Sequence, residues 1–317
     1  MRAFVFPGQG SQFIGMGRDL AEAFPAARET FEEVDDALGQ KLYKLMTEGN
    51  EADLNLTENT QPALMAVSMA IINVLTREGK IQLGQKINFV AGHSLGEYSA
   101  LTAVGALDLP KTAKLLKLRG QAMQKAVPVG IGAMAAILGL DLPDVQLLVK
   151  DATAKALNKE VVESANDNSS GQIVISGHKG AVAIAIEMAP ERGAKKAIAL
   201  PVSAPFHSTL MAPAAQTMSQ ALADTNIRPP IVPVISNVTA KAVSEPHEIR
   251  RLLVDQITGM VRWRESVTFM KEQGVEEMIE IGAGKVLAGL IKRIEKDVAC
   301  ESVGTPEQVE ALIKKLS

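Results

Sequence analysis

A serine that stands two residues from a glycine on each side, in Gly92-His93-Ser94-Leu95-Gly96, constrains this chain more than any other segment. Residues 87–91 before it favour a short buried strand, and residues 97–104 after it are small and compatible with a helix. A strand that turns abruptly into a helix at such a segment exposes the serine as a nucleophile, and the glycines keep side chains off the turn. We therefore expect an α/β fold with Ser94 strained at a helix start and with His93 in a structural role.

The composition excludes several classes of protein. A length of 317 residues exceeds the usual single core, so we expect two lobes. Hydrophobic residues make up 47% of the chain and aromatic residues 3%, which suits close helix–sheet packing. The net charge of −3, without interleaved basic and aromatic residues, argues against nucleic acid as a partner.

The lone cysteine, Cys300, excludes a disulfide framework and fits a reducing cytoplasm. The N-terminal apolar run is too short for a signal peptide, and no segment reaches membrane-spanning length. The four histidines are too scattered for a paired-histidine zinc site. We expect a soluble cytoplasmic protein without a metal and without a membrane partner.

The order of the expected elements predicts how the lobes are built. A strand at 2–6, a glycine-containing loop at 7–12, helices to residue 38 and an apolar helix at 60–78 precede the elbow strand. Phe13 stands where a dinucleotide fingerprint needs glycine, so we expect Gly8 and Gly10 to let backbone amides approach a ligand. In the second half, a helix after Met211, a strand at 231–236, helices from 246 and a last strand at 278–281 are expected.

Residues 128–200 between these parts follow the order β-α-β-β-α-β, which is that of a ferredoxin-like unit. The expected strands are 133–138, 161–165, 172–176 and 195–200, and the expected helices are 142–157 and 179–192. We predict a large α/β-hydrolase-like lobe with a mostly parallel sheet, formed by residues 1–127 and 201–317, and an inserted ferredoxin-like lobe at 128–200.

The serine needs a base, and His207 is the best candidate. It follows a loop-like segment where the chain re-enters the large lobe, whereas His178 and His247 open helices and favour surface roles. A hydrolase with the chain order Ser-Asp-His would need an acid on a large-lobe loop before the histidine. The acids in that interval fall in the inserted lobe: Asp141, Asp144, Asp151 and Asp167. A backbone carbonyl is the remaining way to orient His207, which weakens the case for a hydrolase.

Arg119 lies on the apolar stripe of the helix predicted at 109–125. Its neighbours one turn away are Leu115, Leu116, Ala122 and Met123, while the polar side carries Lys111, Lys114, Lys117 and Lys125. Because a broken buried ion pair costs about 3–5 kcal/mol, a carboxylate is expected to meet this guanidinium. That carboxylate belongs either to an internal Asp or Glu or to a substrate held by the bidentate fork.

Over its whole length the chain resembles the malonyl-CoA:acyl carrier protein transacylase family of bacterial fatty acid synthesis. The resemblance rests on Phe6-Pro7-Gly8-Gln9-Gly10-Ser11-Gln12, residues 92–100, Arg119-Gly120, Asn166-Asp167-Asn168, residues 201–207 and Gly282-Ala283-Gly284-Lys285-Val286-Leu287. It implies ping-pong transfer in which Ser94 attacks the malonyl thioester of coenzyme A and His207 acts as base, then as acid. It also implies an oxyanion hole made by the backbone amides of Gln9 and Leu95, where losing one donor costs about 10²–10³ in rate.

The same resemblance implies roles for four further residues. Arg119 would bind the malonyl carboxylate, the backbone carbonyl of Gln256 would orient His207, and Asn166 would face the site from the small lobe. Phe206 departs from the smaller residue that stand-alone bacterial members often carry before the histidine. In related polyketide acyltransferase domains, phenylalanine there accompanies malonyl over methylmalonyl selection.

The resemblance also implies partners: malonyl-CoA as substrate, holo-acyl carrier protein as acceptor, and no bound cofactor. We expect a monomer. Because acyl carrier proteins are acidic, the candidate docking charges are Lys111, Lys114, Lys117, Lys195, Lys196, Arg262, Arg264, Lys285, Lys292 and Arg293. Two other functions stay open: a serine thioesterase or esterase, and an acyl-CoA-binding or scaffold protein whose elbow does not react.

Overall fold

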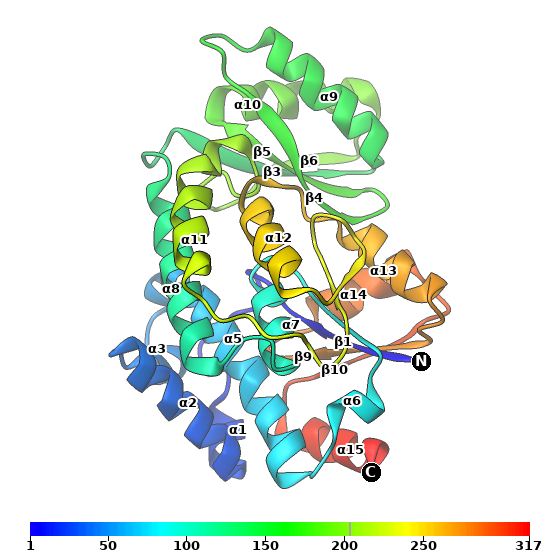
Figure 1. Ribbon diagram of the computed structural model, residues 1–317. Helices are drawn as coiled ribbons and strands as arrows, with labels where there is room; N and C mark the ends of the chain where they lie inside the picture. Colours follow the sequence, from blue (N-terminus) through cyan, green and yellow to red (C-terminus); the bar gives the residue numbers. More distant parts are fainter. Residues whose placement is uncertain (203) are drawn as a thin grey trace.

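Two β-sheets organise the computed structural model, which describes residues 1–202 and 204–317 (Figure 1). Ser203, in the segment before His207, lies outside the described residues. The strands are β1 (Arg2–Phe6), β2 (Phe89–Gly92), β3 (Gly132–Leu138), β4 (Val162–Ser169), β5 (Gln172–His178), β6 (Lys196–Ala199), β7 (Val234–Ile235), β8 (Ala242–Val243), β9 (Glu277–Ile281) and β10 (Ala299–Val303). The large sheet has the order β10-β9-β1-β2-β7-β8, and all its neighbouring strands are parallel except β7 and β8.

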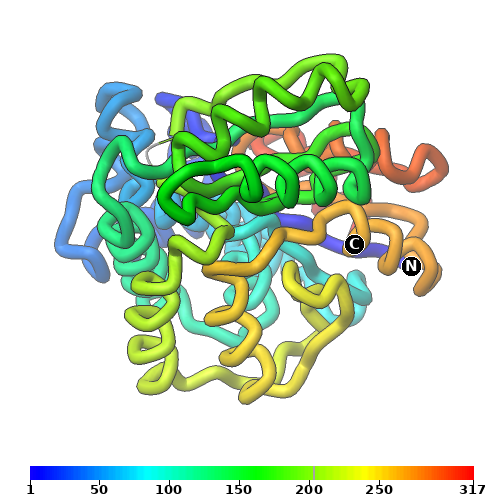
Figure 2. The backbone as a smooth tube through the Cα atoms, turned by 90° about the horizontal axis from the view of Figure 1, so that it is seen from above, coloured from blue at the N-terminus to red at the C-terminus, as the bar shows by residue number. Residues whose placement is uncertain are grey.

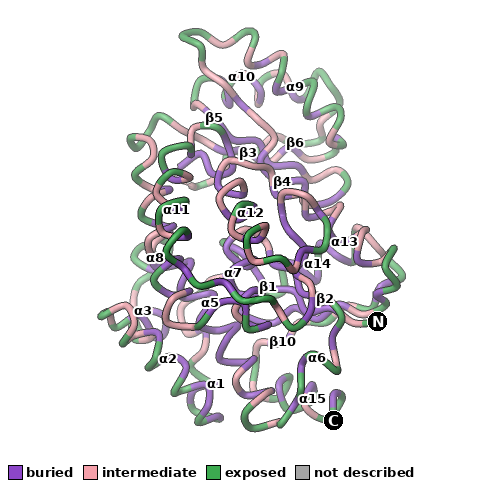
Figure 3. The backbone as a smooth tube through the Cα atoms, in the orientation of Figure 1, coloured by how far each residue is buried: buried purple, intermediate pink, exposed green. Residues whose placement is uncertain are grey.

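Helices cover both faces of the large sheet. They are α1 (Arg18–Ala23), α2 (Pro25–Leu38), α3 (Leu42–Glu48), α4 (Glu51–Leu54), α5 (Thr57–Asn73) with a π-helical turn at Val74–Glu78, α6 (Leu83–Lys86), α7 (Gly96–Ala103), α8 (Leu109–Lys125), α11 (Ala212–Ala223), α12 (Pro246–Thr258), α13 (Trp263–Glu272), α14 (Val286–Ile294) and α15 (Pro306–Leu316). Alternate side chains of β1 enter different cores: Phe4 and Phe6 join the α5 side, and Ala3 and Val5 join α13 and α14. Figure 3 shows the buried segments gathered around β1 and α7.

The small sheet has the antiparallel order β4-β5-β3-β6, with helices α9 (Leu142–Lys155) and α10 (Lys179–Met188). This strand order and the β-α-β-β-α-β chain order are those of the ferredoxin-like unit predicted from the sequence. Both helices lie side by side on the face turned away from the large sheet (Figures 1 and 2). Ile137, Ile173 and Ile175 pack under these helices, whereas Met134 and Val174 on the opposite face join the large core.

Two strand predictions need correction. The strand expected at 231–236 is only Val234–Ile235, paired with the unpredicted β8, because prolines at 230 and 233 donate no ladder hydrogen bonds. The strand at 278–281 is not the last, since β10 extends the sheet beside β9. Its sequence Ala-Cys-Glu-Ser-Val lacks the apolar run of a central strand because it forms the sheet edge.

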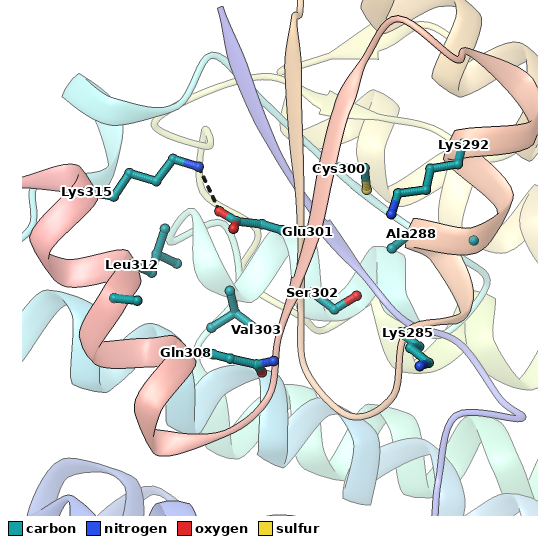
Figure 4. A pocket seen from close by; sticks show the side chains of 12 residues that line it. Lys285, Ala288, Lys292, Cys300, Glu301, Ser302, Val303, Gln308, Leu312 and Lys315 are labelled. Carbon is teal, nitrogen blue, oxygen red and sulfur yellow. Dashed lines mark hydrogen bonds and ion pairs between the residues drawn. The ribbon is translucent and has the colours of Figure 1, made fainter.

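A groove of about 620 Å³ between α14 and α15 follows this edge (Figure 4). Glu301 and Val303 point toward α15, and Cys300 and Ser302 point toward α14. Lys315 forms a hydrogen bond of 2.8 Å with Glu301, so charged side chains border the edge and discourage pairing with another strand.

In the described part of the chain, no helix is long and apolar enough to cross a membrane.

Candidate active site

The nucleophile elbow lies between β2, which ends at Gly92, and α7, which begins at Gly96. Ser94 between them has φ 53°, a left-handed conformation that is strained for a residue with a side chain. A Cβ at Gly92 would lie 1.9 Å from the carbonyl carbon of Gly96, and one at Gly96 would lie 2.3 Å from the carbonyl oxygen of Phe6. Only glycine therefore fits either position, as the motif predicted.

His207 is the base candidate that the fold brings to the serine. Its Nε2 lies 2.8 Å from Ser94 Oγ, and its Nδ1 lies 2.9 Å from the carbonyl oxygen of Gln256 and 3.1 Å from that of Gly259. Carbonyl oxygens only accept, so Nδ1 carries the proton and Nε2 is left to accept the serine proton. Burial, and next the charge of Arg119, lower the pKa of His207 to about 3. The imidazole is thus neutral at pH 7 and needs no triad acid to orient it.

Arg119 is 1% exposed, as its place on the apolar stripe predicted. Nη1 donates to Gln61 Oε1 at 2.9 Å, and Nη2 donates to Gln256 Oε1 at 2.8 Å and to Ser94 Oγ at 3.2 Å. Among the described residues, no carboxylate lies within 4.0 Å of this guanidinium as an ion pair, and its Nε has no hydrogen-bond partner. An internal Asp or Glu in direct contact, one of the two alternatives drawn from the sequence, is therefore absent.

A cavity of about 290 Å³ joins these groups, and residues from the parts of the chain around both sheets line it. The small sheet contributes Met134, Ala136, Asn166, Asn168, Gln172 and Val174. The segments around the large sheet contribute Gln9, Gln61, His93, Ser94, Leu95, Arg119, Met123, Phe206 and His207. The structure thus brings together every site residue predicted from the sequence, with Gln256 just beneath the lining. Within the described residues, the backbone amides of Gln9 and Leu95 have no protein acceptor, so both can donate to a ligand.

His93 makes a structural contact, as expected from the sequence, and Gly8 is needed for a reason that the sequence did not show. His93 lines the cavity and its Nε2 lies 2.8 Å from Asn168 Oδ1, so it joins the elbow to β4 of the small sheet. A Cβ at Gly8 would lie 2.6 Å from the His93 carbonyl oxygen, so Gly8 is required by backbone packing. Of the four acids considered for a triad, Asp167 pairs with Arg264 at 2.7 Å.

The comparisons with known proteins agree with this geometry. The family model for the acyl transferase domain matches residues 3–315. The malonyl CoA-acyl carrier protein transacylase of Bacillus subtilis is 45% identical over 314 residues, covering 99% of this chain and 96% of the relative. The chain belongs to the malonyl-CoA:acyl carrier protein transacylase family.

Solved structures of related transacylases share its fold. The acyl-carrier-protein S-malonyltransferase of Bartonella henselae has a TM-score of 0.96 at 53% identity, covering 99% of each chain. A malonyl-transacylase solved in complex with its type II PKS acyl-carrier protein has a TM-score of 0.94 at 42% identity, again covering 99% of each chain.

Sequence reasoning missed two buried polar residues of this transacylase. Asn237, which follows β7, accepts from the backbone N–H of Ser94 at 2.7 Å and donates to the carbonyl oxygen of Gly92 at 2.7 Å. Glu97, in the first turn of α7, is 3% exposed and accepts from Gln256 Nε2 at 2.7 Å. An acidic residue in a first helical turn is ordinary, and nothing near Asn237 in the sequence marks it.

Proposed function

We propose that this transacylase moves malonyl from coenzyme A to the phosphopantetheine thiol of acyl carrier protein through a malonyl ester on Ser94. The observation that carries the proposal is the convergence in one cavity of Ser94, His207 and an Arg119 that no carboxylate of the described residues contacts directly. Serine and histidine supply acyl chemistry, and the guanidinium selects an acyl group with a distal carboxylate.

In the first half-reaction, Ser94 Oγ attacks the thioester carbonyl carbon and its proton passes to His207 Nε2, 2.8 Å away. The backbone amides of Gln9 and Leu95 stabilise the oxyanion that forms. When the C–S bond breaks, the coenzyme A thiolate takes the proton from His207 and leaves. The thiol of acyl carrier protein then repeats the sequence in reverse: it gives its proton to His207, and its sulfur attacks the ester carbonyl carbon. The C–O bond to Ser94 breaks, and Oγ takes the proton back from His207.

The malonyl carboxylate meets Arg119, which lines the cavity and whose Nη2 lies 3.2 Å from Ser94 Oγ. This pair fixes the acyl group while the cleft keeps water out of an attacking position, which favours transfer over hydrolysis. The related transacylases and the solved complex with acyl-carrier protein support a thiol acceptor. Phe206, 8% exposed, narrows the same cavity, in keeping with selection of the smaller malonyl group.

Mass spectrometry after incubation with malonyl-CoA tests the proposal. An adduct of about 86 Da on Ser94 that disappears when holo-acyl carrier protein is added is expected. Ser94→Ala is the control and should carry no adduct. An adduct lost to water as fast as to carrier protein would identify a thioesterase, and no adduct on the wild-type protein would identify a binding protein.

The acceptor docks, in our proposal, beside α14 rather than on α8. Lys292 and Arg293 are exposed on α14, and Arg293 Nη1 donates to Gln172 Oε1 at 2.7 Å, on the rim of the cavity. On α8, Lys114 is exposed too, but Lys117 is held by Gln40 and Asn59, which do not line the cavity.

We further propose a monomer that works in the cytoplasm without a cofactor, with residues 128–200 as a separate lobe. Sedimentation of the purified protein and fractionation of cells test the monomer and the location.

A further inference from the structure

The Gln256 side chain lies at the centre of the polar contacts beneath the cavity. Its Oε1 accepts from Arg119 Nη2 at 2.8 Å. Its Nε2 donates to Glu97 Oε2 at 2.7 Å and to the backbone oxygen of Ser94 at 3.0 Å. A guanidinium can only donate and a peptide carbonyl can only accept, so the chemistry of these partners fixes which end of the amide faces which.

Turning the amide over would oppose like groups at both ends. The NH₂ group would face the N–H groups of Arg119, and Oε1 would face the oxygens of Glu97 and Ser94. Of the three acceptors of Gln256 Nε2, Glu97 is the closest, ahead of the Ser94 oxygen and of Asn237 Oδ1 at 3.4 Å, and the one that carries a charge. It therefore contributes most to the orientation that gives Arg119 an acceptor. Because Glu97 also accepts from the backbone N–H of Asn237 at 3.2 Å, it is held from a second side.

We propose that Glu97 is a positioning residue for substrate selection, which orients the Gln256 amide toward Arg119 and balances the guanidinium charge across that amide. This inference rests on the proposed function, because Arg119 is taken to bind the malonyl carboxylate. Glu97 does not line the cavity, so it acts through Gln256 and not on the substrate.

The charge of Glu97 gives a readout that a purely structural role would lack. Burial raises its pKa to about 7, against opposing contributions from Gln256, Asn237 and the charge of Arg119. The titratable groups that face it are Arg119 from α8 and Tyr98 from its own helix, while α12 and the segment after β7 present neutral amides. Ionised Glu97 offsets part of the Arg119 charge, so the KM for malonyl-CoA should rise as the pH rises through about 7. The KM for acetyl-CoA, which has no distal carboxylate, should not.

Two substitutions separate orientation from charge. Glu97→Leu removes the acceptor, and we expect kcat/KM for malonyl-CoA to fall about 10²-fold, as a misplaced binding group typically causes, with a smaller loss for acetyl-CoA. Glu97→Gln keeps an acceptor oxygen without the charge. It should restore malonyl transfer to within a few-fold of wild type at pH 6 and abolish the dependence of KM on pH.

Glu280 offers the matched control. It is also a buried carboxylate, accepting from the backbone N–H groups of Leu287 and Ala288 at 3.1 and 2.8 Å, but it does not line the cavity. Glu280→Leu and Glu280→Gln should change malonyl and acetyl transfer equally and keep the wild-type dependence of KM on pH.

Three results would overturn the inference. The first is an equal loss of both substrates in Glu97→Leu, with circular dichroism showing a folded protein. The second is a Glu97→Gln variant that keeps the wild-type dependence of KM on pH, which decides the matter if Glu97→Leu does not fold. The third is a wild-type protein that transfers no malonyl, which would overturn the proposed function as well, whereas the first two leave that function standing.

Discussion

Replacing Arg119 with alanine separates its proposed role in binding the substrate from a role in supporting the fold. Malonyl has a distal carboxylate that can contact the guanidinium, and acetyl does not. A charge-assisted hydrogen bond contributes about 1.5–3 kcal/mol, and a bidentate contact makes two of them. Losing both therefore lowers malonyl transfer by about 10²- to 10⁴-fold. In the variant, the amide oxygens of Gln61 and Gln256 lose their donor. The cost of leaving them unpaired is the same for both substrates, so it cancels in the ratio of kcat/KM for malonyl-CoA to that for acetyl-CoA.

Acetyl transfer should survive in Arg119→Ala for a second reason. The Arg119 charge is the second cause, after burial, of the low pKa of His207, so its removal raises that pKa and makes the base stronger. The assay is kcat/KM for malonyl-CoA and for acetyl-CoA, with transfer to holo-acyl carrier protein followed by mass spectrometry. Arg250→Ala is the control, since this half-buried arginine donates to the carbonyl oxygens of Leu222 and Thr225. Equal losses for the two substrates would mean that Arg119 only supports the fold.

Three further outcomes are expected. Gly92→Ala should abolish the elbow and lower the melting temperature sharply, because its Cβ would lie 1.9 Å from Gly96. Gly289→Ala in α14 is the control: a Cβ there meets nothing within 4 Å, so it should stabilise the protein by about 0.5–1 kcal/mol. Equal melting temperatures of the two variants would contradict this. Asn237→Ala leaves the backbone N–H of Ser94 and the carbonyl of Gly92 without their partner, and each unsatisfied buried group costs about 1–3 kcal/mol. The rate of Ser94 acylation, measured by rapid-quench mass spectrometry, should therefore fall at least tenfold. An unchanged rate would contradict the role of this contact. His207 must be neutral to act as the base, and its pKa is about 3, so kcat/KM for acetyl-CoA should not fall between pH 7 and pH 5. A fall with a midpoint near the ordinary histidine pKa of about 6.5 would refute the low pKa of His207.

The parts of the site that could be predicted are those with local signals. The elbow follows from the spacing of two glycines around Ser94, and the burial of Arg119 follows from its position on the apolar stripe of α8. The ferredoxin-like sheet follows from the order of strands and helices, since that order allows few arrangements.

The parts that could not be predicted depend on contacts between distant segments. Asn237 reaches the elbow from a point 143 residues away along the chain, after a strand of only two residues. Glu97 looks like an ordinary first-turn acid until the fold buries it against α12. β10 pairs on one side only, so its sequence does not need the apolar run that marks the central strands.

The surroundings of Arg119 explain how a buried cation stays available to a substrate. A carboxylate of the protein in direct contact would offset the desolvation of the guanidinium, but it would also occupy the donors proposed to bind malonyl and cancel their charge. The amide oxygens of Gln61 and Gln256 satisfy two donors without adding a negative charge. The balancing charge of Glu97 lies one amide further away, across Gln256. The sequence argument offered an internal carboxylate or a substrate carboxylate for Arg119, and the described residues place no internal carboxylate in contact with it. Contact with a substrate carboxylate therefore stays the prediction that Arg119→Ala tests.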